Sequence, residues 1–190
     1  MAKGPVFKLT PENTLKAELK AGKLRQVYYV YGEETFLDNM YADRIISTAG
    51  CEQSDGMNFL KLRGAPDPHS LSDFTESLPF FAEHKCVKLI DLDAEAMDND
   101  SHKELLRLIE ELPDTTVMVI CQTGLEIDDM KPKAKTKKLI QTVEKCGMVC
   151  KMQFLPAAMT AAMAAKKAQK SGCTLSQENA SSCHTLSVTI

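Results

Sequence analysis

Acidic, hydroxyl and lysine side chains that could do phosphoryl chemistry recur at the ends of predicted strands. They are Glu33, Glu34, Asp91, Thr123 and Lys151. Because the carboxyl ends of parallel strands meet at one edge of a sheet, we expect these side chains to converge there. In that arrangement the acids would bind a divalent cation, Asp91 would accept a phosphoryl group and the lysine would steady it.

Three features of the sequence weaken this hypothesis. Lys151 lies inside a predicted strand instead of just beyond it, and the first pair of acids are glutamates, whose reach is longer than that of aspartates. A helix is also predicted before the first strand. A receiver-like phosphoacceptor domain with Asp91 as acceptor is therefore the alternative hypothesis.

The first of these turns, Gly32-Glu33-Glu34-Thr35, also occupies the place of a nucleotide site. A phosphate loop needs a glycine, four residues and then Gly-Lys-Ser/Thr, so that backbone amides and a lysine hold the phosphates. This turn has no second glycine and no lysine, and its glutamates put negative charge where an anion would sit. Acids are favoured at the start of a helix in any case. We expect no ATP site, no cofactor and no catalytic activity of the chain's own.

Five lysines fall within residues 131–138, at the start of a predicted helix. Such a run is usually a solvated face. It could also contact phosphates in a larger assembly, since these contacts need charge and no particular sequence. Both interpretations remain open, and the candidate phosphate contacts are Lys131, Lys133 and Lys135.

Two aromatic residues, Phe80 and Phe81, are adjacent just ahead of a predicted strand. Neighbouring side chains diverge by about 100° on a helix and point to opposite faces of a strand, so both rings cannot easily enter one core. Exposed aromatic side chains are good anchors for a partner's pocket. The alternative is a curled loop that tucks both rings under the sheet.

Apolar runs alternate with segments of helical periodicity along the chain. Strands are predicted at residues 27–31, 58–62, 86–92, 116–121 and 148–154, and helices lie between them, with Ser70 and Ser101 as N-caps of two. The fold class is therefore α/β, a five-stranded parallel sheet flanked by helices with a P-loop-like core that lacks a P-loop. Residues 1–154 form this domain, and residues 155–190 form the start of a small helical domain in which Gly172 ends one helix and Ser176 caps another.

Composition limits the classes of function. A formal net charge of −3 argues against a domain that grips nucleic acid alone. The seven cysteines are scattered without a C-x-x-C pair, which predicts neither a disulfide framework nor a zinc site, and no metal is expected. Without a signal sequence or a long apolar run, we expect a cytoplasmic protein that does not bind membranes.

An ordered set of segments resembles the delta subunit of the bacterial DNA polymerase III clamp loader. The segments are YVYGEETFLD at residues 29–38, SLPFFAEHKCVKLIDL at 77–92, LLRLIEELPDTTVMVI at 105–120 and KAKTKKLIQTVEKCG at 133–147. The resemblance covers about residues 15–155 and continues more weakly to about 180. It implies an AAA+ type domain without an ATP site, followed by a partial helical lid domain.

The resemblance also implies a function in DNA replication. Delta subunits bind and open the sliding clamp with two adjacent apolar residues ahead of the third strand, which correspond here to Phe80 and Phe81, with Leu78 beside them. The usual pair is leucine then phenylalanine, so Phe80 departs from the pattern. The implied partners are the sliding clamp, primed DNA within the assembly, and other clamp-loader subunits through a collar domain that these residues do not include.

Overall fold

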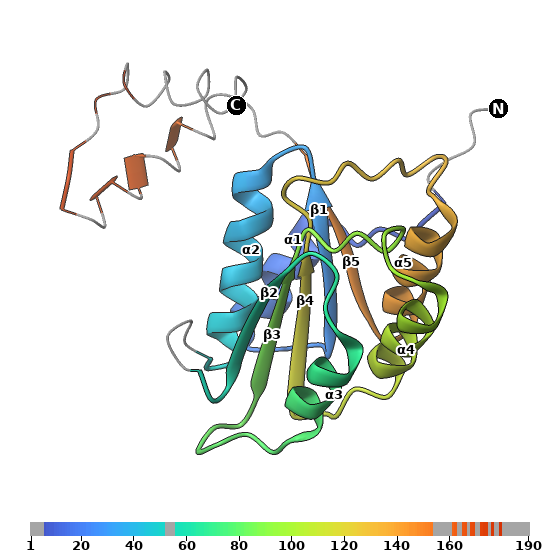
Figure 1. Cartoon of the computed structure of the whole chain (residues 1–190). Coiled ribbons are helices and arrows are strands. Elements are labelled where there is room, and N and C mark those ends of the chain that lie inside the picture. The colour runs from blue at the N-terminus through green and yellow to red at the C-terminus, as the bar shows by residue number, and fades with distance from the viewer. Residues whose placement is uncertain are drawn as a thin grey trace. The chain divides into compact units, whose positions relative to one another are not determined.

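The computed structural model of the chain describes residues 6–51 and 56–153, together with scattered positions between 161 and 179 (Figure 1). The chain divides into two compact units, Met1–Met152 and Gln153–Ile190. Most of the second unit lies outside the described residues, so its assignment as a partial helical lid stays a prediction.

A five-stranded sheet forms the centre of the first unit. Every neighbouring pair of strands is parallel, and the strand order is β2-β3-β4-β1-β5. The strands are β1 (Val27–Gly32), β2 (Phe59–Arg63), β3 (Lys85–Ile90), β4 (Thr116–Cys121) and β5 (Gly147–Met152). The predicted fold class, a five-stranded parallel sheet flanked by helices, is confirmed.

Helices cover both faces of this sheet. They are α1 (Glu12–Lys20), α2 (Thr35–Thr48), α3 (Pro68–Glu76), α4 (Asn99–Glu110) and α5 (Ala134–Cys146). Figure 1 shows α1 and α2 on one face and α3, α4 and α5 on the other. Strands β3 and β4 are buried along their whole length. Burial on both faces explains why β4 is almost wholly apolar and does not alternate, while β3 buries two lysines, Lys85 and Lys88, among its apolar residues.

Two helix starts differ from the sequence prediction. The N-cap of α3 is Asp67, whose carboxylate accepts a hydrogen bond from the Ser70 N–H at 3.0 Å. The N-cap of α4 is Asp98, which accepts from the Ser101 N–H at 2.8 Å. The predicted caps Ser70 and Ser101 are wrong, because each lies three residues inside its helix and an upstream aspartate accepts from its N–H.

Gly32, at the end of β1, lies against the backbone of β5. A Cβ atom at this position would be 2.0 Å from the carbonyl oxygen of Met152, a separation that requires the backbone to move. The glycine of the first turn therefore serves the close approach of two strands.

We expect Gly32→Ala to lower the free energy of unfolding by ~1–3 kcal/mol or more, since this is the usual cost of overpacking a tight site. Gly56→Ala is the matched control, since a Cβ there meets nothing within 4 Å. Urea melts of both variants measure the difference. Equal midpoints would show that β5 can shift away at no cost.

Within the second unit, two predicted boundaries fall on described positions. The Gly172 N–H donates to the Gln169 carbonyl at 3.1 Å, and Gly172 has a φ of 74°. This left-handed backbone is what a glycine supplies at a helix end. The Ser176 hydroxyl accepts from the Asn179 N–H at 3.2 Å, as expected of an N-cap.

Candidate partner-binding site

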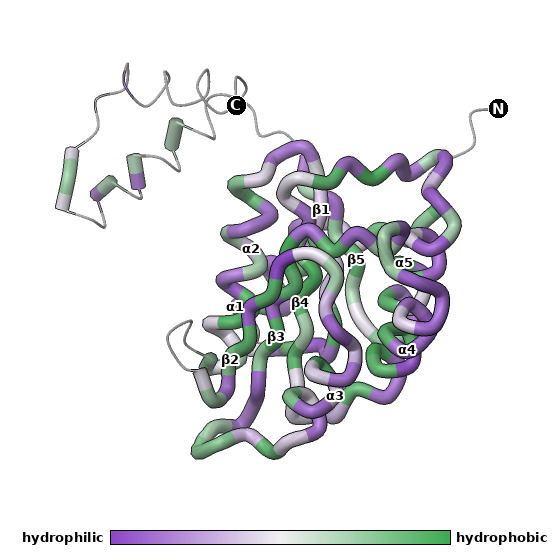
Figure 2. The backbone as a smooth tube through the Cα atoms, in the orientation of Figure 1, coloured by the Kyte–Doolittle hydropathy of each residue, from purple (hydrophilic) through white to green (hydrophobic). Residues whose placement is uncertain are grey.

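Three large apolar side chains stand in solvent on the loop between α3 and β3. Leu78 is 83% exposed, Phe80 53% and Phe81 96%. We call these three residues the apolar tip. Their loop is the lowest segment in Figure 1, and Figure 2 colours part of it as hydrophobic. The alternative in which a curled loop tucks both rings under the sheet is therefore wrong.

The two rings of the apolar tip pack against each other. Their centroids are 4.5 Å apart and their planes meet at 78°, an edge-to-face arrangement. Phe81 has a φ of 50°, in the left-handed region that bulky residues rarely adopt. Such a backbone persists only where its surroundings hold it, and it clusters at active sites, ligand clamps and switch regions.

A buried lysine holds the start of this loop. Lys85, the first residue of β3, is 4% exposed, and its ammonium donates to the Phe74 carbonyl at 3.0 Å and to the Ser77 hydroxyl. The same ammonium lies 4.2 Å from the centre of the Phe74 ring. The loop therefore leaves α3 at a fixed point. The sequence marks Lys85 only as a charge beside a strand, and nothing in its spacing predicts this role.

At the opposite edge of the sheet, Asp91 is fully engaged by neighbours. Its Oδ1 accepts from the N–H groups of Thr123 and Gly124 at 2.6 and 2.8 Å, and the Thr123 hydroxyl donates at 3.0 Å. Arg63 forms an ion pair with its other oxygen. Burial alone would raise the pKa of Asp91, but these donors outweigh it and the pKa lies below its ordinary value. The carboxylate therefore links the loop that follows β3 to the loop that follows β4.

The other members of the predicted phosphoacceptor set lie in different surroundings. The Lys151 ammonium donates to Asp129 at 2.6 Å, and Tyr31 donates to the other oxygen of Asp129 at 2.6 Å. Glu33 is exposed. The structure thus brings Asp91 and Thr123 together, while the ammonium of Lys151 is occupied by Asp129.

The three candidate phosphate contacts differ in how free their ammonium groups are. Lys131 and Lys133 are exposed. Lys135 is half-buried, and its ammonium donates to the Met97 carbonyl. Lys131 and Lys133 can reach a ligand in solvent, whereas Lys135 would first have to break this contact.

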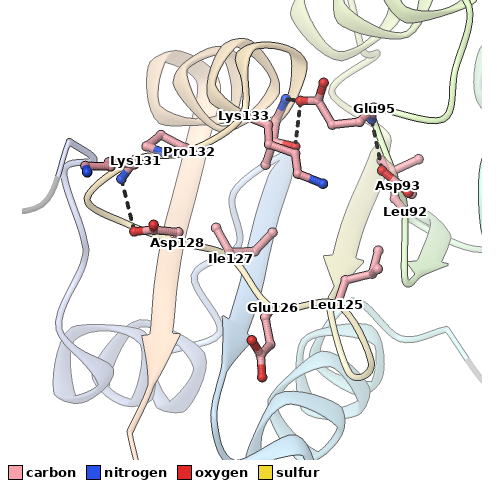
Figure 3. A pocket seen from close by; sticks show the side chains of 11 residues that line it. Leu92, Asp93, Glu95, Leu125, Glu126, Ile127, Asp128, Lys131, Pro132 and Lys133 are labelled. Atoms are coloured by element: carbon pink, nitrogen blue, oxygen red, sulfur yellow. Dashed lines mark hydrogen bonds between the residues drawn. The ribbon is translucent and has the colours of Figure 1, made fainter.

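A carboxylate already occupies the start of α5. Glu95 accepts from the N–H groups of Lys135 and Thr136, both at 2.9 Å. Burial by itself would raise the pKa of Glu95, but these hydrogen bonds lower it below its ordinary value. The residues around it line a pocket of about 260 Å³, drawn in Figure 3, with acidic and basic side chains mixed on its walls. An anion at this helix start would have to displace Glu95.

Two acids of the first turn and helix lie inside the protein. Glu34 is 6% exposed and Asp38 is 0% exposed, and neither carboxylate oxygen of Asp38 has a hydrogen-bond partner. Burial, with a smaller effect of the nearby Glu34 charge, raises the pKa of Asp38 to about 7. Sequence analysis missed this residue, although Asp38 shares the buried stripe of α2 with Tyr41 and Ile45 at helical spacing.

In the part of the chain that the structure describes, no three histidine, cysteine or acidic side chains gather as metal ligands do. Among those same residues, no helix is both long enough and apolar enough to cross a bilayer.

A family model described as DNA polymerase III, delta subunit, matches residues 28–148. No match was found among curated protein sequences. The matched range contains β2, β3 and β4 in full, β1 except Val27, and the first two residues of β5, and it includes the apolar tip.

Solved structures share the fold. The DNA clamp loader delta protein (YqeN) of Bacillus subtilis superposes with a TM-score of 0.59 at 21% identity, over 93% of this chain and 54% of that one. A DNA polymerase III gamma subunit-related protein of Thermotoga maritima gives 0.53 at 14% identity, over 92% and 58%. The RuvB branch migration motor of the same organism gives 0.56 at 13%, over 88% and 51%. The chain spans about half the length of each.

Proposed function

We propose that this chain, which belongs to the DNA polymerase III delta subunit family, binds and opens the sliding clamp during DNA replication in the cytoplasm. It does so without an ATP site of its own, as a member of a clamp loader. The exposed pair of rings, Phe80 and Phe81, carries this proposal, with Leu78 beside them.

The physical support comes from the cost of exposing these side chains. Burying an apolar surface stabilises by ~25 cal/mol per Å², so three large apolar side chains in solvent are favourable to cover. Here they lie together on one short loop, in which Phe81 has a left-handed backbone. Aromatic side chains of this kind are typical anchors at the centre of an interface.

Two lysines are proposed as contacts to DNA within the assembled loader. Lys131 and Lys133 are exposed at the carboxyl edge of the sheet, and a phosphate contact requires only their charge. The net charge of −3 means that they act beside other subunits and not alone. Lys135 is the weakest of the three candidates, because its ammonium donates to the Met97 carbonyl.

The direct test is binding of the 190-residue chain to a purified bacterial sliding clamp, measured by titration with and without magnesium and ATP. We expect saturable binding that is the same in both conditions, since the Gly32-Glu33-Glu34-Thr35 turn lacks the groups that hold a triphosphate. Absence of binding at tens of micromolar clamp would contradict the proposal, because a dissociation constant of about 1 μM would give nearly complete binding at that concentration.

A further inference from the structure

The backbone of the apolar tip is held by one side chain from a distant part of the chain. Asn58 precedes β2, and its Oδ1 accepts a hydrogen bond from the Phe80 N–H at 2.7 Å. Its Nδ2 donates to the Phe80 carbonyl at 2.8 Å. One carboxamide therefore pairs with both backbone polar groups of Phe80, much as a neighbouring strand would.

Asn58 is itself fixed to the sheet. The residue is 4% exposed, and its backbone carbonyl accepts from the Cys86 N–H of β3 at 2.7 Å. A carboxamide that is buried and bonded at both ends has little rotational freedom. The side chain of Asn58 thus links the exposed loop to the start of the β2–β3 pair, which is held in place by the sheet.

We infer that Asn58 is a positioning residue for the clamp contact, and that it fixes the direction in which the Phe80 and Phe81 rings project. The inference rests on the proposed function and extends it from the rings to the residue that aims them. Lys85 anchors where the loop leaves α3, and Asn58 anchors the middle of the loop, directly before Phe81. A loop that is already ordered loses less conformational entropy when it binds, which increases affinity.

The variants Asn58→Ala and Asn58→Asp test this role in the full chain. Alanine removes both hydrogen bonds to Phe80. Aspartate keeps the size and the acceptor for the Phe80 N–H, but it replaces the donor with an oxygen that faces the Phe80 carbonyl. Asn99→Ala, on the exposed first turn of α4, is the matched control.

We expect each Asn58 variant to weaken clamp binding by about tenfold, while Asn99→Ala binds as the wild type does. Amide hydrogen exchange gives an independent readout, since the Phe80 N–H should exchange faster in Asn58→Ala with no change at the amides of β4. Unchanged affinity in Asn58→Asp, with the chain folded, would overturn the inference.

A double-mutant cycle separates positioning from a general loss of stability. In a Phe80→Ala, Phe81→Ala background, Asn58→Ala should cost no further affinity, because the rings that it aims are absent. An equal loss in both backgrounds would overturn the positioning role and leave the proposed function intact. A wild-type chain that does not bind the clamp would overturn the proposed function, and the inference with it.

Discussion

Replacing both Phe80 and Phe81 with alanine is expected to weaken binding to the sliding clamp at least roughly thirty-fold. A buried aromatic anchor at an interface typically costs ~2 kcal/mol or more when it is cut to alanine. The folding midpoint should stay nearly unchanged, because the rings are 53% and 96% exposed and leave no cavity in the core. Core rings of this size would instead cost ~3–5 kcal/mol of folding stability. Titration against the clamp and a denaturant melt of the same variant measure both quantities.

A matched control is available at the opposite edge of the sheet. Phe36 is 44% exposed and belongs to α2. This helix follows the carboxyl end of β1 (Figure 1). In an otherwise wild-type chain, Phe36→Ala removes an aromatic ring from the surface and leaves the apolar tip intact, so clamp binding should persist. Full clamp affinity in a folded Phe80→Ala, Phe81→Ala variant would place the contact elsewhere and refute the assignment of these rings.

The strands could be predicted because their signal is local. A central strand with helices on both faces is mostly apolar, and residues 116–121 carry that signal without help from the rest of the chain. Helix starts were less certain, since Asp67 and Ser70 are both good N-caps by type. Only the three-dimensional path of the chain decides which of the two accepts the hydrogen bond.

For the candidate site, the sequence predicts the exposed rings but not the residues that hold them. Because Phe80 and Phe81 are adjacent, the sequence predicts that both rings cannot easily enter one core. In the structure both rings are exposed. The residues that hold them could not be found, since Asn58 acts on a residue 22 positions away and Lys85 acts as a buried hydrogen-bond donor. Contacts of this kind depend on the strand order, and no local pattern in the sequence encodes them.

Asp38 is a buried acid whose replacement should change stability. It lies on the inner stripe of α2, it is fully buried, and neither of its carboxylate oxygens has a hydrogen-bond partner. The buried ammonium of Lys88 on β3 does not compensate it, because that ammonium donates to Asp43 at 2.7 Å. An ionised Asp38 would thus be an unpaired charge inside the protein, which is costly.

The sign of the pH dependence follows from proton binding. Burial, followed by the Glu34 charge, raises the pKa of Asp38 to about 7, from 3.8 for the ordinary group. Between these values the folded protein keeps the proton and the unfolded chain has lost it. Stability from this group is therefore complete below about pH 4, falls as the pH rises towards 7, and stays low above it.

Asp38→Asn should accordingly stabilise the protein above pH 7, because the amide stays neutral in both states. At ~1.4 kcal/mol per pKa unit, the gain at pH 8 is on the order of 2–4 kcal/mol, and it should vanish near pH 4. Urea melts from pH 4 to 8 measure the difference in free energy of unfolding between the variant and the wild type. The effects of the other carboxylates cancel in this difference.

Asp73→Asn, at an exposed position of α3, is the control, and its difference from the wild type should not vary with pH. A flat difference for Asp38→Asn as well would mean that the buried carboxylate is compensated in solution, and the predicted charge cost would be wrong.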